Sequence, residues 1–120
     1  MMVLVDTSVW IDHLHHGDAT LGAALEKGSV LTHPLVIGEL ACGNLRRRVE
    51  ILRLLSELPQ APVASNAEVL EFIERRHLMG RGIGFVDAHL LASVTLAGSA
   101  TLLTTDRRLA AVATELERRQ

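Results

Sequence analysis

The sequence is short of cysteine and of aromatic residues, and both shortages narrow the choice of folds. Cys42 is the sole cysteine among 120 residues, so no disulfide can form within the chain, which favours a reducing environment. In the context "GELACGNL" this thiol is expected to be buried as a small hydrophobe. The aromatic side chains are limited to Trp10, Phe72 and Phe85, so an aliphatic core is expected.

Long apolar runs are missing as well. No stretch approaches the roughly 20 apolar residues that a membrane helix needs. The first apolar run meets Asp6 too early for a secretory signal. We therefore expect a cytoplasmic protein with no membrane partner. A length of 120 residues predicts one domain, residues 1–120, with its own hydrophobic core.

Lysine is nearly absent, so arginine carries almost all of the positive charge. The net charge is −2, but arginines cluster at 46–48, 75–76, 107–108 and 118–119. Arginine can bind phosphate through two parallel hydrogen bonds. Some of these arginines also follow a glutamate by four residues, the spacing of ion pairs on solvated helices. Phosphate binding and helix solvation therefore both remain open.

Short apolar runs alternate with helical patterns along the chain. The segments 2–6, 29–34, 61–64 and 100–105 are typical of strands covered on both faces. Helices are predicted over 8–17, 21–28, 35–43, 45–58, 67–80, 85–98 and 106–120. This alternation predicts an α/β fold, with a small parallel sheet of about four strands and helices on both faces.

Four acidic residues stand where a structural role alone explains them poorly. Asp6 and Asp106 follow the first and last predicted strands, and sites in parallel sheets form beyond the carboxyl ends of strands. Glu39 and Asp87 lie in the apolar stretches "PLVIGELACG" and "GFVDAHLLAS". Because a buried, isolated carboxylate is costly, each needs a partner. A metal ion would serve all four at once.

Each acid also has an ordinary explanation when it is taken alone. Asp6 and Asp106 could cap helices, Asp87 could favour a helix dipole, and Glu39 could be exposed to solvent. Four converging carboxylates would repel each other, and a hard cation would remove that repulsion. Oxygen ligands without histidine or cysteine indicate Mg²⁺ or Mn²⁺. The usual chemistry of such a site is phosphodiester hydrolysis by an activated water.

Hydroxyl side chains flank the acids at both strand ends. Thr7, Ser8, Thr104 and Thr105 could orient the acids or hold metal-bound water, or they could simply be polar residues at strand ends. The turn "GRGIG" lacks the "GKS" or "GKT" of a phosphate-binding loop. We expect this turn to aim Asp87 into the site, and Arg81 within it is a candidate RNA contact.

Taken in order, four segments closely resemble the signature of PIN domains, and more narrowly of the VapC toxins of toxin–antitoxin pairs. They are "LVDTSVWID", "GELACG", "GFVDAHLLAS" and "LLTTDRRL", and the resemblance covers essentially the whole chain. It implies a small parallel sheet between helices and a metal-dependent endoribonuclease. Asp6, Glu39, Asp87 and Asp106 match the family's catalytic, metal-binding acids, of which the fourth is the most variable. Ser8 matches a small polar position that often supports the first acid.

The same resemblance implies partners that no pattern in the residues indicates. They are a VapB-type antitoxin, a second copy of the chain in a homodimer, and an RNA substrate such as tRNA or ribosomal RNA. The alternative is a catalytically inactive PIN-like module that binds RNA or protein. A flap-type DNA nuclease would need a helical arch for which this chain has no room. A receiver domain needs a late lysine, and a haloacid-dehalogenase-like phosphatase needs an aspartate where Ser8 stands.

Overall fold

A parallel sheet of three strands forms the centre of the computed structural model, which describes residues 1–119. The strands β1 (Met2–Val5), β2 (Val30–Leu31) and β3 (Ala100–Leu103) lie in the order β2-β1-β3. Leu4 and Val5 of the central strand are fully buried, which explains the unbroken apolar run at the start of the chain. The register pairs Val5 with Leu103, so β1 and β3 end side by side.

The predicted strand at 61–64 does not form. A single parallel bridge joins Thr32 to Gln60 instead, with the hydrogen bonds Thr32 N–H to Pro59 O (2.9 Å) and Ala61 N–H to Thr32 O (2.8 Å). Pro59 and Pro62 flank this bridge and have no N–H to donate, so a longer ladder cannot form there. The rest of the predicted α/β architecture is confirmed.

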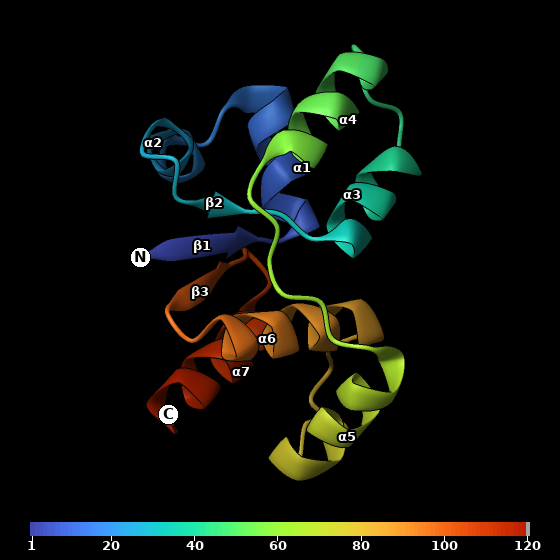
Figure 1. Cartoon of the computed structure of the whole chain (residues 1–120), viewed down its shortest axis with the longest axis vertical. Coiled ribbons are helices and arrows are strands. Elements are labelled where there is room, and N and C mark those ends of the chain that lie inside the picture. Colours follow the sequence, from blue (N-terminus) through green and yellow to red (C-terminus); the bar gives the residue numbers. More distant parts are fainter. Residues whose placement is uncertain (120) are drawn as a thin grey trace.

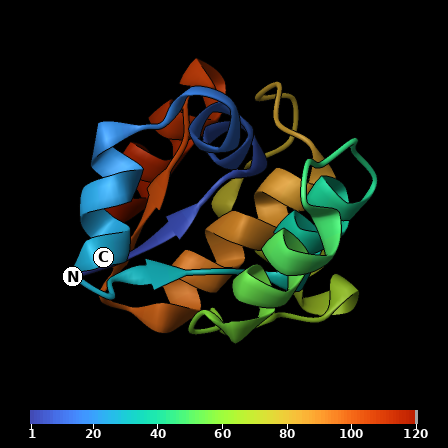
Figure 2. The ribbon, with the colours of Figure 1, turned by 90° about the horizontal axis from the view of Figure 1, so that it is seen from above.

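Seven helices complete the described part of the chain, and they cover both faces of the sheet (Figures 1 and 2). They are α1 (Thr7–His16), α2 (Ala19–Glu26), α3 (Pro34–Ala41), α4 (Arg48–Glu57), α5 (Asn66–Arg76), α6 (Phe85–Ala97) and α7 (Arg107–Arg118). In Figure 1, α1 to α4 lie on the β2 side of the molecule and α5 to α7 on the β3 side. No helix within residues 1–119 has the length and apolar character needed to cross a bilayer.

Capping residues explain where several helices begin. The Asp18 carboxylate accepts from Leu21 N–H (2.8 Å), so α2 begins at Ala19, before the predicted helix over 21–28. Ser65 and Glu68 form a reciprocal capping box at α5. Arg47 has a left-handed backbone (φ 52°), which delays the start of α4 to Arg48.

The core is aliphatic, as expected, and Trp10 is buried within it. Cys42 is exposed, so the prediction that it is buried was wrong. It occupies the C-cap of α3, beyond Leu40, the last residue of that helix that is buried in the core. The thiol therefore lies where the chain leaves the apolar interior.

Candidate active site

Asp6 lies directly after β1 and is only 8 % exposed. Its carboxylate accepts three hydrogen bonds, from Thr7 N–H (2.8 Å), Ser8 Oγ (3.3 Å) and Thr104 Oγ1 (2.8 Å). Buried polar groups are normally paired, and these three donors satisfy the carboxylate of Asp6. The three hydrogen bonds therefore hold the nearly buried carboxylate of Asp6 in one orientation.

Thr104 connects Asp6, which follows β1, to Asp106, which follows β3. Its hydroxyl donates to Asp6 and accepts from the backbone N–H of Asp106 (3.1 Å). The hydroxyl of Thr105 forms a hydrogen bond with the hydroxyl of Ser8, at 3.2 Å. Of the hydroxyls singled out in the sequence, Thr104 makes the most direct connection, and Thr105 reaches the acids only through Ser8.

Glu39 is exposed on α3, whereas Val36 and Leu40 of the same helix face the core. The expectation that Glu39 occupies a buried apolar face was therefore wrong. Its Oε1 nevertheless accepts from Thr7 Oγ1 at 2.5 Å, a contact between residues 32 positions apart. Thr7 follows Asp6 directly, so this hydrogen bond brings Glu39 to the carboxyl end of β1.

Asp87 is half-buried in the first turn of α6, where its Oδ2 accepts from Gly84 N–H at 2.9 Å. Burial raises the pKa of Asp87, and the Gly84 hydrogen bond lowers it. The negative charges of Asp6, Asp106 and Glu39 raise the pKa of Asp87 further. The charges of the other three predicted acids therefore all act on Asp87.

Asp106 is exposed and caps α7, since its Oδ1 accepts from Arg108 N–H (2.9 Å) and Leu109 N–H (3.1 Å). The capping role considered from the sequence is therefore correct. The charge of Asp106 also acts on Asp87. One carboxylate thus starts a helix and faces the acidic site.

The chemistry of the donors fits a hydrated divalent cation. Within residues 1–119, no three His, Cys, Asp or Glu side chains are close enough together to hold one ion as they stand. Mg²⁺ typically binds proteins through one or two carboxylates and keeps several waters, so it does not require such a cage. The carboxylates offer only oxygen ligands, and a cation would relieve the repulsion that raises the pKa of Asp87.

The glycine-rich turn before α6, residues 80–84, packs against α7. Arg81 pairs with Glu115 (2.8 Å), and its side chain is 34 % exposed. Gly82 has φ +79°, and a Cβ there would lie 2.7 Å from the Arg108 side chain. These contacts support the expectation that the turn places Asp87, because Gly84, the last residue of the turn, donates to Asp87.

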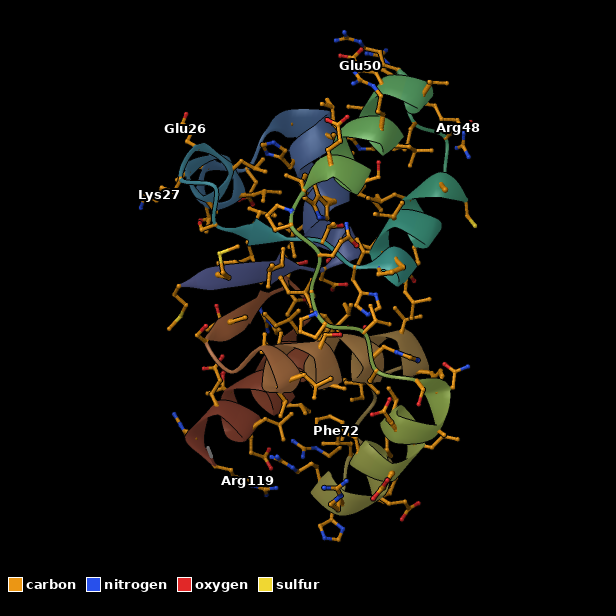
Figure 3. All side chains as sticks on the ribbon, viewed as in Figure 1. Glu26, Lys27, Arg48, Glu50, Phe72 and Arg119 are labelled. Atoms are coloured by element: carbon orange, nitrogen blue, oxygen red, sulfur yellow. The ribbon has the colours of Figure 1, made fainter. Side chains whose placement is uncertain are left out.

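The arginine clusters are spread over several helices, and the pair at 107–108 directly follows Asp106. Arg48 and Arg119 project from opposite ends of the molecule in Figure 3. Several arginines form ion pairs with glutamates three or four residues away in the sequence. These pairs are Arg47–Glu50, Arg53–Glu57, Arg75–Glu71 and Arg119–Glu115. Helix solvation therefore accounts for these arginines better than one continuous phosphate-binding surface does.

Sequence reasoning missed His33, which is fully buried and caps α3. Its Nδ1 accepts from Leu35 N–H at 3.0 Å, and burial lowers the pKa of His33 to about 4. The available signal was Pro34, since proline at the first helical position marks the residue before it as the N-cap. His89 is buried as well, and its Nε2 lies 2.8 Å from Asn66 Oδ1.

Comparison with known proteins agrees with this architecture. Residues 3–115 match the PIN domain family. Two similar proteins are Ribonuclease VapC32 of Mycobacterium tuberculosis strain CDC 1551 / Oshkosh and Ribonuclease VapC32 of strain ATCC 25618 / H37Rv. Each is 52% identical over 114 residues, which cover 95% of this chain and 92% of the relative. The chain therefore belongs to the PIN-domain family, with VapC proteins as its relatives.

Proposed function

We propose that this protein is a metal-dependent endoribonuclease and the toxin of a VapBC toxin–antitoxin pair. The observation that carries this proposal is the electrostatic coupling of Asp87 to Asp6, Glu39 and Asp106 at one edge of the sheet. A cluster of carboxylates repels the phosphates of RNA, so it can act on RNA only with a cation between them. The names of the relatives, which are ribonucleases, support the same function.

Asp6, Glu39, Asp87 and Asp106 are proposed to hold Mg²⁺ or Mn²⁺ and thereby to form the catalytic site. A bound divalent ion would polarise a water for attack on the phosphodiester and offset the charge that develops on the phosphate. The protein contributes orientation. Three donors fix the carboxylate of Asp6 before any ion arrives.

The hydroxyl groups hold the acids in place. Thr7 orients Glu39, Ser8 contacts Asp6, and Thr105 supports Ser8. Such partners align metal ligands, and their loss typically weakens metal binding or activity by about 10- to 100-fold. Arg81 is proposed as a weaker RNA contact at the edge of the site, on the turn that leads to Asp87.

The family resemblance supports further proposals about partners. We propose a VapB-type antitoxin that covers the acidic site, a homodimer, and tRNA or ribosomal RNA as the substrate in the cytoplasm. Glu39 and Asp106 are exposed, so the site suits an inhibitor that presents a positive charge, because such a group would replace the cation among the carboxylates.

Cleavage of total cellular RNA by the purified, antitoxin-free protein tests this function. The reactions contain Mg²⁺, Mn²⁺ or EDTA, and the variants are Asp6→Asn and, as a matched control, Asp12→Asn. Asp12 lies exposed on α1, the helix that begins directly after Asp6, and is not one of the four acids. We expect cleavage of a few discrete RNAs by the wild type and by Asp12→Asn, only with metal. Absence of cleavage by the folded wild type would instead favour an inactive binding module.

A further inference from the structure

Two buried histidines lie between the helices that carry Glu39 and Asp87. His33, at the start of α3, is 0 % exposed, and His89, in α6, is 4 % exposed. Their ring centroids are 6.1 Å apart, with 66° between the ring planes. The edge of Phe85 packs against His89, with 4.9 Å between the ring centroids. Neither histidine has a role in the function proposed above.

The hydrogen bonds define which nitrogen of each ring carries the proton. His33 Nδ1 accepts from Leu35 N–H, so the hydrogen of the neutral ring is on Nε2. His89 Nε2 lies 2.8 Å from Asn66 Oδ1, which only accepts, so His89 also carries its hydrogen on Nε2. Both rings are buried, and burial disfavours a charged imidazole.

The two remaining nitrogens are complementary but unpaired. His33 Nε2, a donor, and His89 Nδ1, an acceptor, are both buried without a hydrogen-bond partner among the described residues. Ser93 Oγ, one turn further along α6, is buried and unpartnered as well. Such groups are rare in native proteins and usually bind an ordered water. One water could accept from His33 and donate to His89, and thereby satisfy both rings.

We propose that His33 and His89 are positioning residues, joined by a buried water, that hold α3 and α6 where Glu39 and Asp87 reach one site. His33 begins the helix that carries Glu39, and His89 lies two residues after Asp87 on the same helix. Glu39 is exposed and receives one side-chain hydrogen bond, from Thr7. Its position therefore depends on where α3 begins. The consequence for activity rests on the proposed ribonuclease function.

Two substitutions separate the proposed link from the other roles of each ring. Asparagine at position 33 can still accept from Leu35 N–H and cap α3, but it has no group at the position of Nε2. Glutamine at position 89 can still donate to Asn66, but it has no acceptor at the position of Nδ1. The test therefore uses His33→Asn, His89→Gln and the double variant. The control is Val69→Ala, which removes fully buried methyl groups from α5 and leaves both histidines unsubstituted.

The first measurement is ¹⁵N NMR of the histidine rings in the full-length protein. We expect the Nε2–H tautomer at both positions in the wild type and a shifted Nδ1 resonance of His89 in His33→Asn. A His89 ring protonated on Nδ1, or one unaffected by His33→Asn, would overturn the proposal. This measurement needs no RNA, so it decides the link even if the ribonuclease function fails.

The second measurement is the RNA cleavage rate at saturating metal. We expect each single variant to lower kcat by about tenfold or more, with KM changed less than about twofold, because small displacements of catalytic groups are costly. The double variant should lose no more kcat than the more impaired single variant, because both substitutions remove the same link between His33 and His89. Losses that multiply, or an equal loss of kcat in Val69→Ala at matched thermal stability, would contradict the positioning role.

Discussion

The acids of the site arrive by two routes, and the two pairs are held differently. Asp6 and Asp106 follow neighbouring parallel strands, and Thr104 connects them directly. Glu39 and Asp87 come from helices α3 and α6, and each accepts one hydrogen bond from the protein, from Thr7 and Gly84 respectively. Backbone register therefore aligns the first pair, whereas the packing of helices aligns the second.

We call Asp6 and Asp106 the strand-borne pair and Glu39 and Asp87 the helix-borne pair. The largest effect is expected from Asp6, which is nearly buried. Asp6→Asn should lower RNA cleavage by at least about 100-fold, because it removes a charged ligand of the cation. Thermal stability should stay the same or rise, since one charge leaves a repelling cluster. Cleavage assays and thermal melts of Asp6→Asn beside Asp12→Asn measure both effects. Wild-type cleavage by Asp6→Asn would refute the assignment.

Acid pH should destabilise the fold, because it protonates the buried His33 at the start of α3. The pKa of His33 is lowered from 6.5 to about 4 in the fold, so the native state resists protonation more than the unfolded state does. Stability is therefore full above about pH 6.5 and is lost as pH falls towards about 4, by about 3 kcal/mol. Denaturant melts between pH 7 and pH 4 measure this loss. In His33→Asn this part of the pH dependence should disappear, and an unchanged pH dependence would show that other groups cause it.

Removing the hydroxyl that connects the strand-borne pair should have an intermediate effect. Thr104→Val takes one donor from Asp6 and leaves the N–H of Asp106 without that acceptor. We expect cleavage to fall by about 10- to 100-fold and stability by about 1 kcal/mol. Thr105→Val is the comparison variant. Its loss of activity should be smaller, because the hydroxyl of Thr105 reaches Asp6 only through Ser8. Equal losses in the two variants would refute the distinction between these neighbouring threonines.

The corresponding change on the helix-borne side is Thr7→Val. It removes the hydrogen bond that brings Glu39 towards Asp6, while the backbone N–H of residue 7 still reaches Asp6. We expect a loss of activity of about tenfold, recovered in part at higher Mg²⁺, since the ligand is misplaced but still present. Assays over a range of Mg²⁺ concentrations measure this recovery. A loss that excess metal does not change would mean that Thr7 acts in another way.

Arg81→Ala should have the smallest effect. Its ion pair with Glu115 is partly exposed, so the melting temperature should change little. If Arg81 contacts RNA, KM should rise severalfold with kcat nearly constant. Arg75→Ala, which also breaks a pair with a glutamate, is the control. Equal KM values for both variants and the wild type would end the proposal that Arg81 contacts RNA.

The strand-borne acids could be predicted from the sequence because an apolar run that stops at a charge shows where a strand ends. The same argument fails for Glu39, since an apolar context does not tell which face of a short helix is buried. It also failed at 61–64, where the prolines prevent a ladder. The pairing of His33 with His89 could not be predicted, because it joins residues distant in sequence through tertiary packing alone.

The central claim is that the acids form one cation site, and Mn²⁺ binding followed by electron paramagnetic resonance tests it most directly. The wild type and Asp12→Asn should bind Mn²⁺ with the same affinity. Asp6→Asn, from the strand-borne pair, and Asp87→Asn, from the helix-borne pair, should each bind at least about tenfold more weakly. Mn²⁺ affinities of Asp6→Asn and Asp87→Asn equal to that of Asp12→Asn would contradict the claim.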